Sequence, residues 1–366
     1  MSDVENVRLE KSSNSVVKTI GILTSGGDAP GLNAAIRGVA RTAINQYGIK
    51  VIGIEEGYRG LMQGLGHELT ANELSGILTR GGTILGTSRE KPFKIGKEAV
   101  NAIKENYKKW NLDALVCIGG NGTNTTASYL AKEGLNVIGL PKTIDNDLVE
   151  TDITFGFHTA VSVATEAIDR LHTTAHSHSR IMIIEVMGHK AGWLGLYAGI
   201  AGGGDVILIP EIPYEIGPIA EHVKRRKEAG HPFSIIVVAE GALSVEEAKL
   251  DKKALKKARK EMPYSIAYRI AKELKEATDL EPRVTVLGYL QRGGTPVPYD
   301  RVLATELGTA AAHMLARGEF GKMVALVNGV PVGVPLEDVA GKIKKVPLDH
   351  KLLKYGKDVG TCFGIE

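Results

Sequence analysis

Apolar segments with the composition of β-strands alternate with amphipathic segments along most of this chain. Nine short segments are rich in valine, isoleucine and leucine and predict strands: Lys18–Thr24, Val51–Ile54, Ala114–Ile118, Asn136–Leu140, Ile181–Val186, Val206–Ile209, Phe233–Ala239, Val284–Leu287 and Met323–Val327. Between them lie segments with helical periodicity, among them Leu32–Asn45, Thr159–Ala175, Ile216–Ala229, Ser265–Ala277 and Thr305–Ala316. Uninterrupted apolar strands joined by helices form parallel sheets covered on both faces. The pattern therefore predicts an α/β fold.

The number of strands bears on the domain organisation. Nine strands are more than most sheets hold, so we expect two three-layer α/β halves with mainly parallel sheets and the active site in the cleft between them. Phe155-Gly156-Phe157 precedes a long helix and places the boundary near residue 155. The expected parts are a polar N-terminal tail (1–17), a first half (18–155), a second half (156–320) and a C-terminal segment (321–366) that returns to the first half.

Glycine is the unusual feature of the composition. The chain has 44 glycines in 366 residues, well above the usual level of about 7%. They cluster after apolar segments, which suits loops where the backbone approaches a ligand closely.

Charge and targeting features restrict the partners and the compartment. The net charge is +3, and the basic run Lys252–Lys260 has the spacing of a solvated helix face. We therefore expect no nucleic-acid partner and no membrane partner. Two cysteines, Cys117 and Cys362, provide no disulfide framework. Without a signal peptide or a long apolar span, the expected location is cytoplasmic.

The loop Pro141–Asp147, with the sequence PKTIDND, follows a predicted strand. Ligands bind at the carboxyl ends of strands in such sheets. Asp145 and Asp147 supply a base and a metal-binding carboxylate, and Lys142 supplies a cation, as phosphoryl transfer to a hydroxyl requires. The alternative is a polar turn stabilised by Asn and Asp side chains.

Two glycine-rich turns and three arginines indicate phosphate binding. Gly26-Gly27 and Gly119–Thr123 each join a strand to a helix, where backbone N–H groups bind anions. Arg180, Arg283 and Arg292 lie near the ends of later strands and are suited to phosphate. Each feature alone is also typical of an ordinary turn or a surface arginine.

Several long motifs, in order, resemble the phosphofructokinase family over roughly residues 17–330. They are GGDAPGLNAAIRG (26–38), GGTILGTSR (81–89), GGNGT (119–123), PKTIDND (141–147), EVMGHKAG (185–192) and LGYLQRGGTPVPYDR (287–301). The resemblance implies ATP-dependent phosphorylation of fructose 6-phosphate at its C1 hydroxyl, as part of glycolysis.

The resemblance also implies roles for particular residues. Asp145 corresponds to the catalytic base, with Thr143, Lys142 and Arg89 as further catalytic residues. Donor-binding positions are Gly27, Tyr58, Arg89, Gly120, Asn121, Gly122 and Thr123. Substrate-binding positions are Thr143, Asp145, Asp147, Arg180, Met187, Gly188, His189, Glu240, Arg283, Tyr289 and Arg292. The implied cofactor is Mg²⁺, with Asp147 and Asn121 near the ion. The implied assembly is a homotetramer or homodimer in which a neighbouring subunit supplies two of the arginines.

The phosphoryl donor is the main open choice. Gly122 stands where diphosphate-using members of the family carry an aspartate that blocks the nucleotide, which favours ATP. Lys142, in contrast, is typical of the diphosphate enzymes, so a diphosphate-dependent phosphotransferase is the alternative. Asn121 replaces an aspartate associated with the metal, and Tyr289 replaces a histidine that helps to bind the 6-phosphate. A kinase of the NAD or diacylglycerol type and a non-catalytic regulatory subunit are more distant alternatives.

Overall fold

The computed structural model describes residues 15–262, 264–278 and 280–365, so residues 1–14 of the expected polar tail lie outside the described residues. The chain forms two compact units. Unit 1 comprises the described residues up to Lys142 together with Glu150–Asp152 and Arg301–Lys342. Unit 2 comprises Thr143–Val149, Ile153–Asp300 and the described residues from Ile343 onward.

These units divide the chain differently from the expected halves. The segment Thr143–Val149 belongs to unit 2, although it directly follows a strand of unit 1. The expected C-terminal segment is shared, because residues up to Lys342 join unit 1 and those from Ile343 join unit 2. The PKTIDND loop is therefore divided between Lys142 and Thr143.

Unit 1 is built on a seven-stranded sheet with the order β11-β10-β5-β4-β1-β2-β3. Its strands are β1 (Thr19–Ser25), β2 (Lys50–Ile54), β3 (Gly66–Glu68), β4 (Ala114–Gly119), β5 (Val137–Pro141), β10 (Lys322–Val327) and β11 (Val330–Pro335). The five central strands are parallel, and the edge strands β3 and β11 are antiparallel to their neighbours. Every residue of β4 and β5 is buried, as expected for strands covered on both faces.

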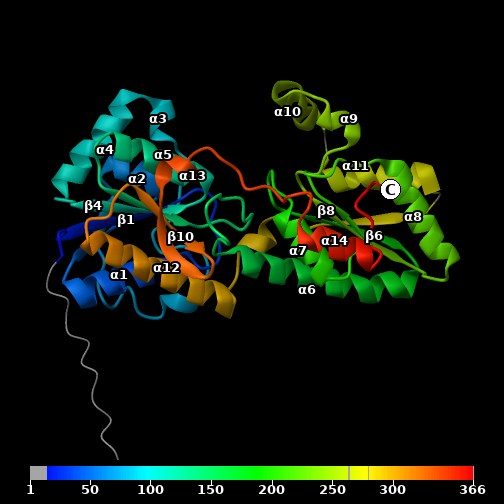
Figure 1. Cartoon of the computed structure of the whole chain (residues 1–366), viewed down its shortest axis with the longest axis horizontal. Coiled ribbons are helices and arrows are strands. Elements are labelled where there is room, and N and C mark those ends of the chain that lie inside the picture. Colours follow the sequence, from blue (N-terminus) through cyan, green and yellow to red (C-terminus); the bar gives the residue numbers. More distant parts are fainter. Residues whose placement is uncertain (1–14, 263, 279, 366) are drawn as a thin grey trace, which may run out of the picture. The chain divides into compact units, whose positions relative to one another are not determined.

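Helices cover both faces of this sheet. They are α1 (Leu32–Tyr47), α2 (Gly57–Gln63), α3 (Pro92–Ile95), α4 (Lys97–Lys109), α5 (Asn121–Lys132), α13 (Leu336–Val339), the 3-10 helix η1 (Ile77–Thr79) and most of α12 (Pro298–Ala316). Figure 1 shows α1 and α12 on one face and α4 and α5 on the other. Unit 1 is thus a three-layer α/β structure.

Unit 2 contains a four-stranded parallel sheet with the order β7-β8-β6-β9. Its strands are β6 (Ile181–Val186), β7 (Val206–Leu208), β8 (Ser234–Ala239) and β9 (Pro282–Val286). Its helices are α6 (Phe157–His178), α7 (Trp193–Ala201), α8 (Ile216–Glu228), α9 (Val245–Ala248), α10 (Lys252–Glu261), α11 (Ile266–Thr278), η2 (Gly288–Arg292) and α14 (Lys351–Asp358). Ile183 and Ile236 of the sheet pack with Val223 of α8 and Ile270 of α11 in one core.

The predicted α/β fold with mainly parallel sheets is confirmed. All nine predicted strands form, with ends within two residues of the predicted ones. The edge strands β3 and β11 were not predicted. Strand β11 carries Pro331 and Pro335, and proline is tolerated in a sheet only at such edges. Helix α12 begins at Pro298, earlier than the predicted Thr305, because proline is compatible with the first turn of a helix.

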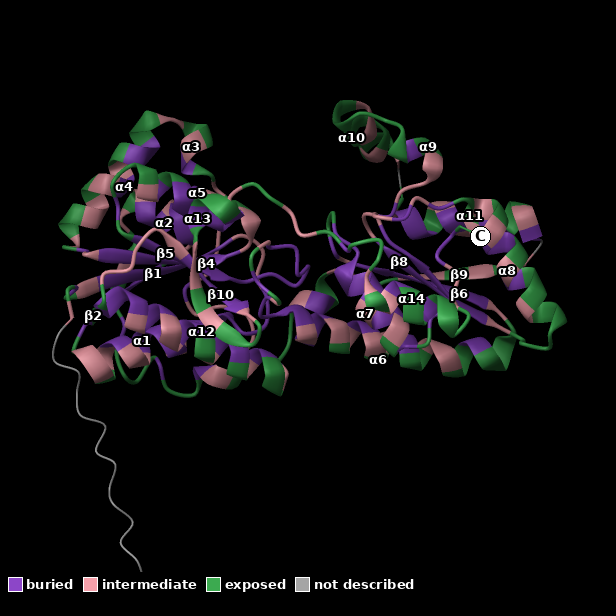
Figure 2. Ribbon diagram, in the orientation of Figure 1, coloured by how far each residue is buried: buried purple, intermediate pink, exposed green. Residues whose placement is uncertain are grey.

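Two further features concern the surface. The basic segment expected to be a solvated helix forms α10, in which no residue is buried, and Figure 2 shows its exposed face. In the described part of the chain, none of the helices combines the length and apolarity needed to span a bilayer.

Candidate active site

The register of the unit 1 sheet brings three loops to one edge. Ser25 at the end of β1 pairs with Gly119 at the end of β4, and Gly119 pairs with Pro141 at the end of β5. The loops that follow these strands therefore leave the sheet side by side. Strand β1 lies between β2 and β4. The chain therefore continues from β1 to a neighbour on one side and returns later, as β4, on the other side. Ligands of open α/β sheets bind at such switch points.

The loop after β1 is held in a glycine-specific conformation. Gly26 has a φ of +89°, which side chains rarely permit. Its N–H donates to the carbonyl of Ser88 at 2.9 Å, and the hydroxyl of Thr87 donates to the Gly26 carbonyl at 2.7 Å. These bonds fasten the segment that carries the exposed Arg89 next to the Gly26-Gly27 loop.

The loop after β4 opens helix α5, whose first N–H groups have no intrahelical partner and form an anion site. A Cβ atom added at Gly122 would meet only the side chain of Lys91, at 3.8 Å or more, so the space outside this turn is open. The hydroxyl of Thr123 donates to the Ser25 carbonyl at 3.1 Å. The amide of Asn121, expected near a metal, donates instead to the carbonyl of Lys342.

Lys142 joins the loop after β5 to the other two. Its side chain is buried, with 3% exposed, and its ammonium group donates to the carbonyl of Gly27. A Cβ atom built at Gly26 would lie 3.8 Å from Lys142 Nζ and 3.6 Å from Thr123 Oγ1. A cation and a helix N-terminus thus converge on the Gly26-Gly27 loop, an arrangement that suits the phosphates of a donor.

Tyr58, expected to flank the nucleotide, lies beneath the first turn of α5. Its side chain is fully buried, and its hydroxyl donates to the carbonyl of Thr123 at 2.8 Å. Burial raises the pKa of this phenol well above its ordinary value. The phenol therefore supports the first turn of α5, and its expected place beside the nucleotide stays a prediction.

The loop that carries the two carboxylates belongs to unit 2. Asp145 and Asp147 are 9% and 6% exposed. The N–H of Asp145 donates to the hydroxyl of Thr143 at 3.0 Å. Asn146, between the two aspartates, has a φ of +50°, a left-handed conformation that asparagine tolerates better than most residues. Its side-chain oxygen accepts the N–H of Thr154 at 3.2 Å, so the loop is closed by its own polar groups.

A second group of expected residues meets at the carboxyl edge of the unit 2 sheet. Val186 pairs with Ala239, and Glu185 pairs with Val286, so the loops after β6, β8 and β9 leave together. They surround a hollow of about 230 Å³ lined by Glu185, Val186, Met187, Glu240, Val286, Gly288 and Tyr289. The N–H of His189 donates to a carboxylate oxygen of Glu240 at 2.8 Å. Of the expected sugar-binding residues, Met187, Glu240 and Tyr289 line this one hollow, and Gly188 and His189 follow Met187 directly.

Two residues at this edge were not predicted. Gln291 is fully buried; its side-chain oxygen accepts the N–H of Met187 at 3.2 Å, and its amide donates to the carbonyl of Gly288 at 3.1 Å. It therefore connects the loop after β6 to that after β9. Glu185 accepts the N–H of Ala267 at 3.0 Å, and burial raises the pKa of its carboxyl group. Both residues lie within the motifs quoted above, at 185–192 and 287–301, and that position was the only signal in the sequence that could have pointed to them.

The three candidate phosphate-binding arginines do not meet within the chain. Arg292 ends η2, near the carboxyl edge of the unit 2 sheet. Arg180 precedes β6, and Arg283 pairs with Met182 at the start of that strand. Because β6 has six residues with a rise of about 3.3 Å each, Arg180 and Met187 lie roughly 20 Å apart along the strand.

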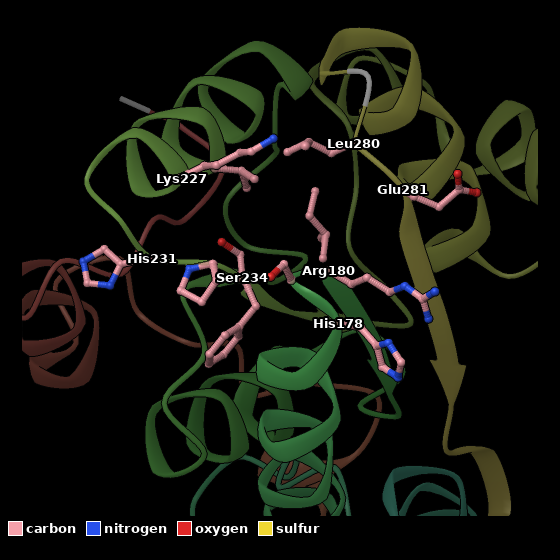
Figure 3. A pocket seen from close by; sticks show the side chains of 12 residues that line it. His178, Arg180, Lys227, His231, Ser234, Leu280 and Glu281 are labelled. Carbon is pink, nitrogen blue, oxygen red and sulfur yellow. The ribbon is translucent and has the colours of Figure 1, made fainter.

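A separate hollow of about 210 Å³ lies at this opposite edge, beside Arg180. Figure 3 shows Arg180 extending to the same side as Glu281, whereas His231 lies on the other side of the hollow. Arg283 forms an ion pair with Glu281 at 3.1 Å. The basic side chains around the hollow do not converge on one point, so it is not by itself a phosphate site.

No metal centre made by protein side chains alone is present in the described residues, since they contain no group of three or more His, Cys, Asp or Glu side chains placed to hold an ion. A divalent ion here would take ligands from a bound phosphate and from water as well as from the protein.

Comparison with known proteins places these loops in a family. The sequence pattern described as "Phosphofructokinase" matches residues 19–315. An ATP-dependent 6-phosphofructokinase from Spirochaeta thermophila is 62% identical over 357 residues, covering 95% of this chain and 98% of the relative. One from Propionibacterium freudenreichii is 53% identical, covering 94% and 99%.

A solved structure agrees with the sequence comparisons. Phosphofructokinase from Saccharomyces cerevisiae superimposes with a TM-score of 0.77 at 34% identity, covering 88% of this chain. This chain spans only 45% of the length of that yeast chain, whereas it spans nearly all of the bacterial relatives. The glycine loops, the PKTIDND loop and the hollow at β6 all lie within the matched residues, and the chain belongs to the phosphofructokinase family.

Proposed function

We propose that this protein transfers the γ-phosphoryl group of ATP to the C1 hydroxyl of fructose 6-phosphate, forming fructose 1,6-bisphosphate and ADP in glycolysis. One observation carries the proposal: the PKTIDND loop contributes residues to both units. Lys142 is hydrogen bonded to the Gly26-Gly27 loop of unit 1, whereas the residues from Thr143 to Val149 belong to unit 2. A single loop thus supplies a donor-side cation and an acceptor-side base. A cytoplasmic location is proposed with this glycolytic role.

In the reaction, Asp145 accepts the proton of the C1 hydroxyl as its oxygen attacks the γ-phosphorus. The new C1–O–P linkage forms as the bond between the γ-phosphorus and the bridging oxygen of ADP breaks. Lys142, Arg89 and the N–H groups of the first turn of α5 stabilise the charge on the phosphates, which is the main contribution a protein makes to phosphoryl transfer. Thr143 orients the base through the N–H of Asp145.

The sugar is assigned to unit 2. Met187 and Gly188 pack against the sugar ring, Glu240 accepts hydrogen bonds from its hydroxyl groups, and His189 lies beside Glu240. Arg292 and Tyr289 bind the 6-phosphate. Tyr289 has 77% of its surface exposed, so its phenol is accessible to a ligand.

We propose Mg²⁺ as the cofactor. The buried carboxylate of Asp147 is the hard oxygen ligand that Mg²⁺ prefers, and phosphates and water complete its shell. When bound, the ion neutralises charge on the donor phosphates. Asn121 is the weaker candidate ligand, because its neutral amide is already hydrogen bonded to Lys342.

ATP is favoured over diphosphate by the open turn at Gly122 and by the ATP-dependent relatives. The test is kcat/KM for fructose 6-phosphate phosphorylation with each donor on the same preparation. We expect the higher value with ATP. A higher value with diphosphate would show that diphosphate, and not ATP, is the donor. The assignments of the base and of the sugar-binding residues would not be affected.

We also propose a homo-oligomer, a tetramer or a dimer, in which Arg180 and Arg283 bind the 6-phosphate held by a neighbouring subunit. The roughly 20 Å of strand β6 between Arg180 and Met187 support this, because both cannot bind one sugar phosphate within a chain. Mixing an Arg283→Ala chain with an Asp145→Asn chain should restore activity. The absence of any restored activity in verified mixed oligomers would contradict subunit sharing.

A further inference from the structure

Lys344 lies far from the PKTIDND loop in sequence but contacts it in unit 2. Its ammonium group donates to the side-chain oxygen of Asn146 at 3.1 Å, and its backbone N–H donates to the carbonyl of Asp147 at 2.8 Å. One lysine thus holds two consecutive residues of the loop, the second of which is a carboxylate assigned to the reaction.

The lysine is itself held in place by α7. The indole N–H of Trp193 donates to the Lys344 carbonyl at 2.9 Å, and the ammonium group lies 5.6 Å from the centre of the Trp193 ring, within the range of a cation–π interaction. Two residues on, the N–H of Val346 donates to Glu211 at 3.0 Å. The position of Lys344 is therefore determined by a buried aromatic residue and a neighbouring carboxylate.

The contact falls on the residue of the loop that has a left-handed backbone. Asn146 holds its left-handed backbone conformation between Asp145 and Asp147, a conformation that residues other than glycine keep only where the surrounding structure holds them in it. Its side-chain oxygen accepts from both Lys344 and the N–H of Thr154. Loss of the ammonium donor would remove one of these two hydrogen bonds and would take a positive charge away from the loop.

We propose that Lys344 is a positioning residue for phosphoryl transfer, holding Asn146 so that Asp145 meets the sugar hydroxyl and Asp147 faces the donor phosphates. This inference rests on the proposed function. It assigns to the C-terminal segment a part in catalysis, although the segment carries none of the family's motifs quoted above.

The test compares kcat and KM for Lys344→Met, Lys344→Arg and a control, Lys345→Met, at saturating donor. Lys345 is the adjacent lysine and is exposed. We expect Lys344→Met to lower kcat by roughly 10–100-fold, the usual effect of a small misplacement of a catalytic group. KM for fructose 6-phosphate should change by less than about threefold, because the contacts at Glu240 and Arg292 are intact. Lys344→Arg should recover most of kcat, and Lys345→Met should match the wild type.

Two results would overturn the inference. One is a Lys344→Met enzyme that keeps more than about half of the wild-type kcat. The other is a folded Lys344→Arg enzyme that is no more active than Lys344→Met, or than Lys344→Gln if the methionine variant does not fold. A wild-type enzyme that phosphorylates no fructose 6-phosphate with either donor would instead contradict the proposed function, so the two failures are distinguishable.

Discussion

The proposed ligand-binding edges of the two units are built in different ways. In unit 1 the edge consists mainly of backbone: the Gly26-Gly27 loop, the first turn of α5 and carbonyl groups that position Lys142 and Thr123. In unit 2 it consists of side chains, because Asp145, Asp147, Glu240 and Arg292 carry the proposed contacts. A site built from backbone groups should lose most function when a substitution adds a side chain. A site built from side chains should lose most when a substitution removes one. Both edges nevertheless follow from the same rule, which places ligands at the carboxyl ends of parallel strands.

The largest effect should come from removing the base in unit 2. Asp145→Asn keeps the size of the side chain but cannot accept the proton, so kcat should fall by roughly 10²–10⁴, with sugar binding nearly unchanged. Steady-state kinetics and sugar binding by calorimetry check this. Asp169→Asn, an exposed change on α6, is the control. An Asp145→Asn enzyme with more than about a tenth of the wild-type kcat would falsify the assignment of the base.

Adding a side chain to unit 1 should have the next largest effect. Gly122→Asp introduces a carboxylate at the phosphate-binding turn of α5, where there is space for it, so the protein should fold normally. Like-charge repulsion of several kcal/mol should abolish ATP use, with kcat/KM lowered roughly 100-fold or more.

The matched control is Gly217→Asp. Gly217 is also the second residue of its helix, α8, and has nothing within 4 Å of an added Cβ atom. Its variant should retain ATP use. Equal loss of activity in both variants, or ATP kinetics unchanged by Gly122→Asp, would show that the α5 turn does not bind the nucleotide.

Truncating a phosphate-binding side chain in unit 2 should have an intermediate effect. Arg292→Ala removes one charge-assisted hydrogen-bond donor worth about 1.5–3 kcal/mol, which lowers kcat/KM for fructose 6-phosphate roughly 10- to 150-fold. KM for ATP should change little, and Arg225→Ala on α8 serves as the control. A loss shared equally by both substrates would mean that Arg292 acts on the whole site and not on the sugar phosphate.

The smallest effect should come from changing Tyr58, the buried residue whose hydroxyl supports the first turn of α5. Tyr58→Phe removes the hydrogen bond to the Thr123 carbonyl and should lower the free energy of unfolding by about 1 kcal/mol. Urea denaturation measures this, with Tyr129→Phe on the exposed face of α5 as the control. A large rise in KM for ATP without a change in stability would instead identify Tyr58 as a direct nucleotide contact.

The parts of the structure that the sequence predicts are those determined by local pattern. Uninterrupted apolar segments identified every central strand, and glycine turns after them located the loops of unit 1. The edge strand β11 escaped prediction because its prolines contradict a strand until its place at the edge is known. The burial of Tyr58 has no local signal, because it depends on the contact of its hydroxyl with Thr123, 65 residues later.

Contacts between distant parts of the chain have no local signal. Lys344 meets Asn146 across a separation of 198 residues, and Gln291 meets Met187 across 104. In the sequence, one is a lysine among other lysines and the other a glutamine before a recognised arginine. Their contacts follow only from the tertiary structure, which brings these distant segments together.

The interleaving of the two units has a consequence for biosynthesis. Strand β5 pairs on one side with β10, which the ribosome produces only after the long segment Ile153–Asp300 of unit 2. At about 5–20 residues per second, β5 remains an open edge for roughly 10–40 s. An unpaired apolar edge can recruit other strands until its partner strand has been made.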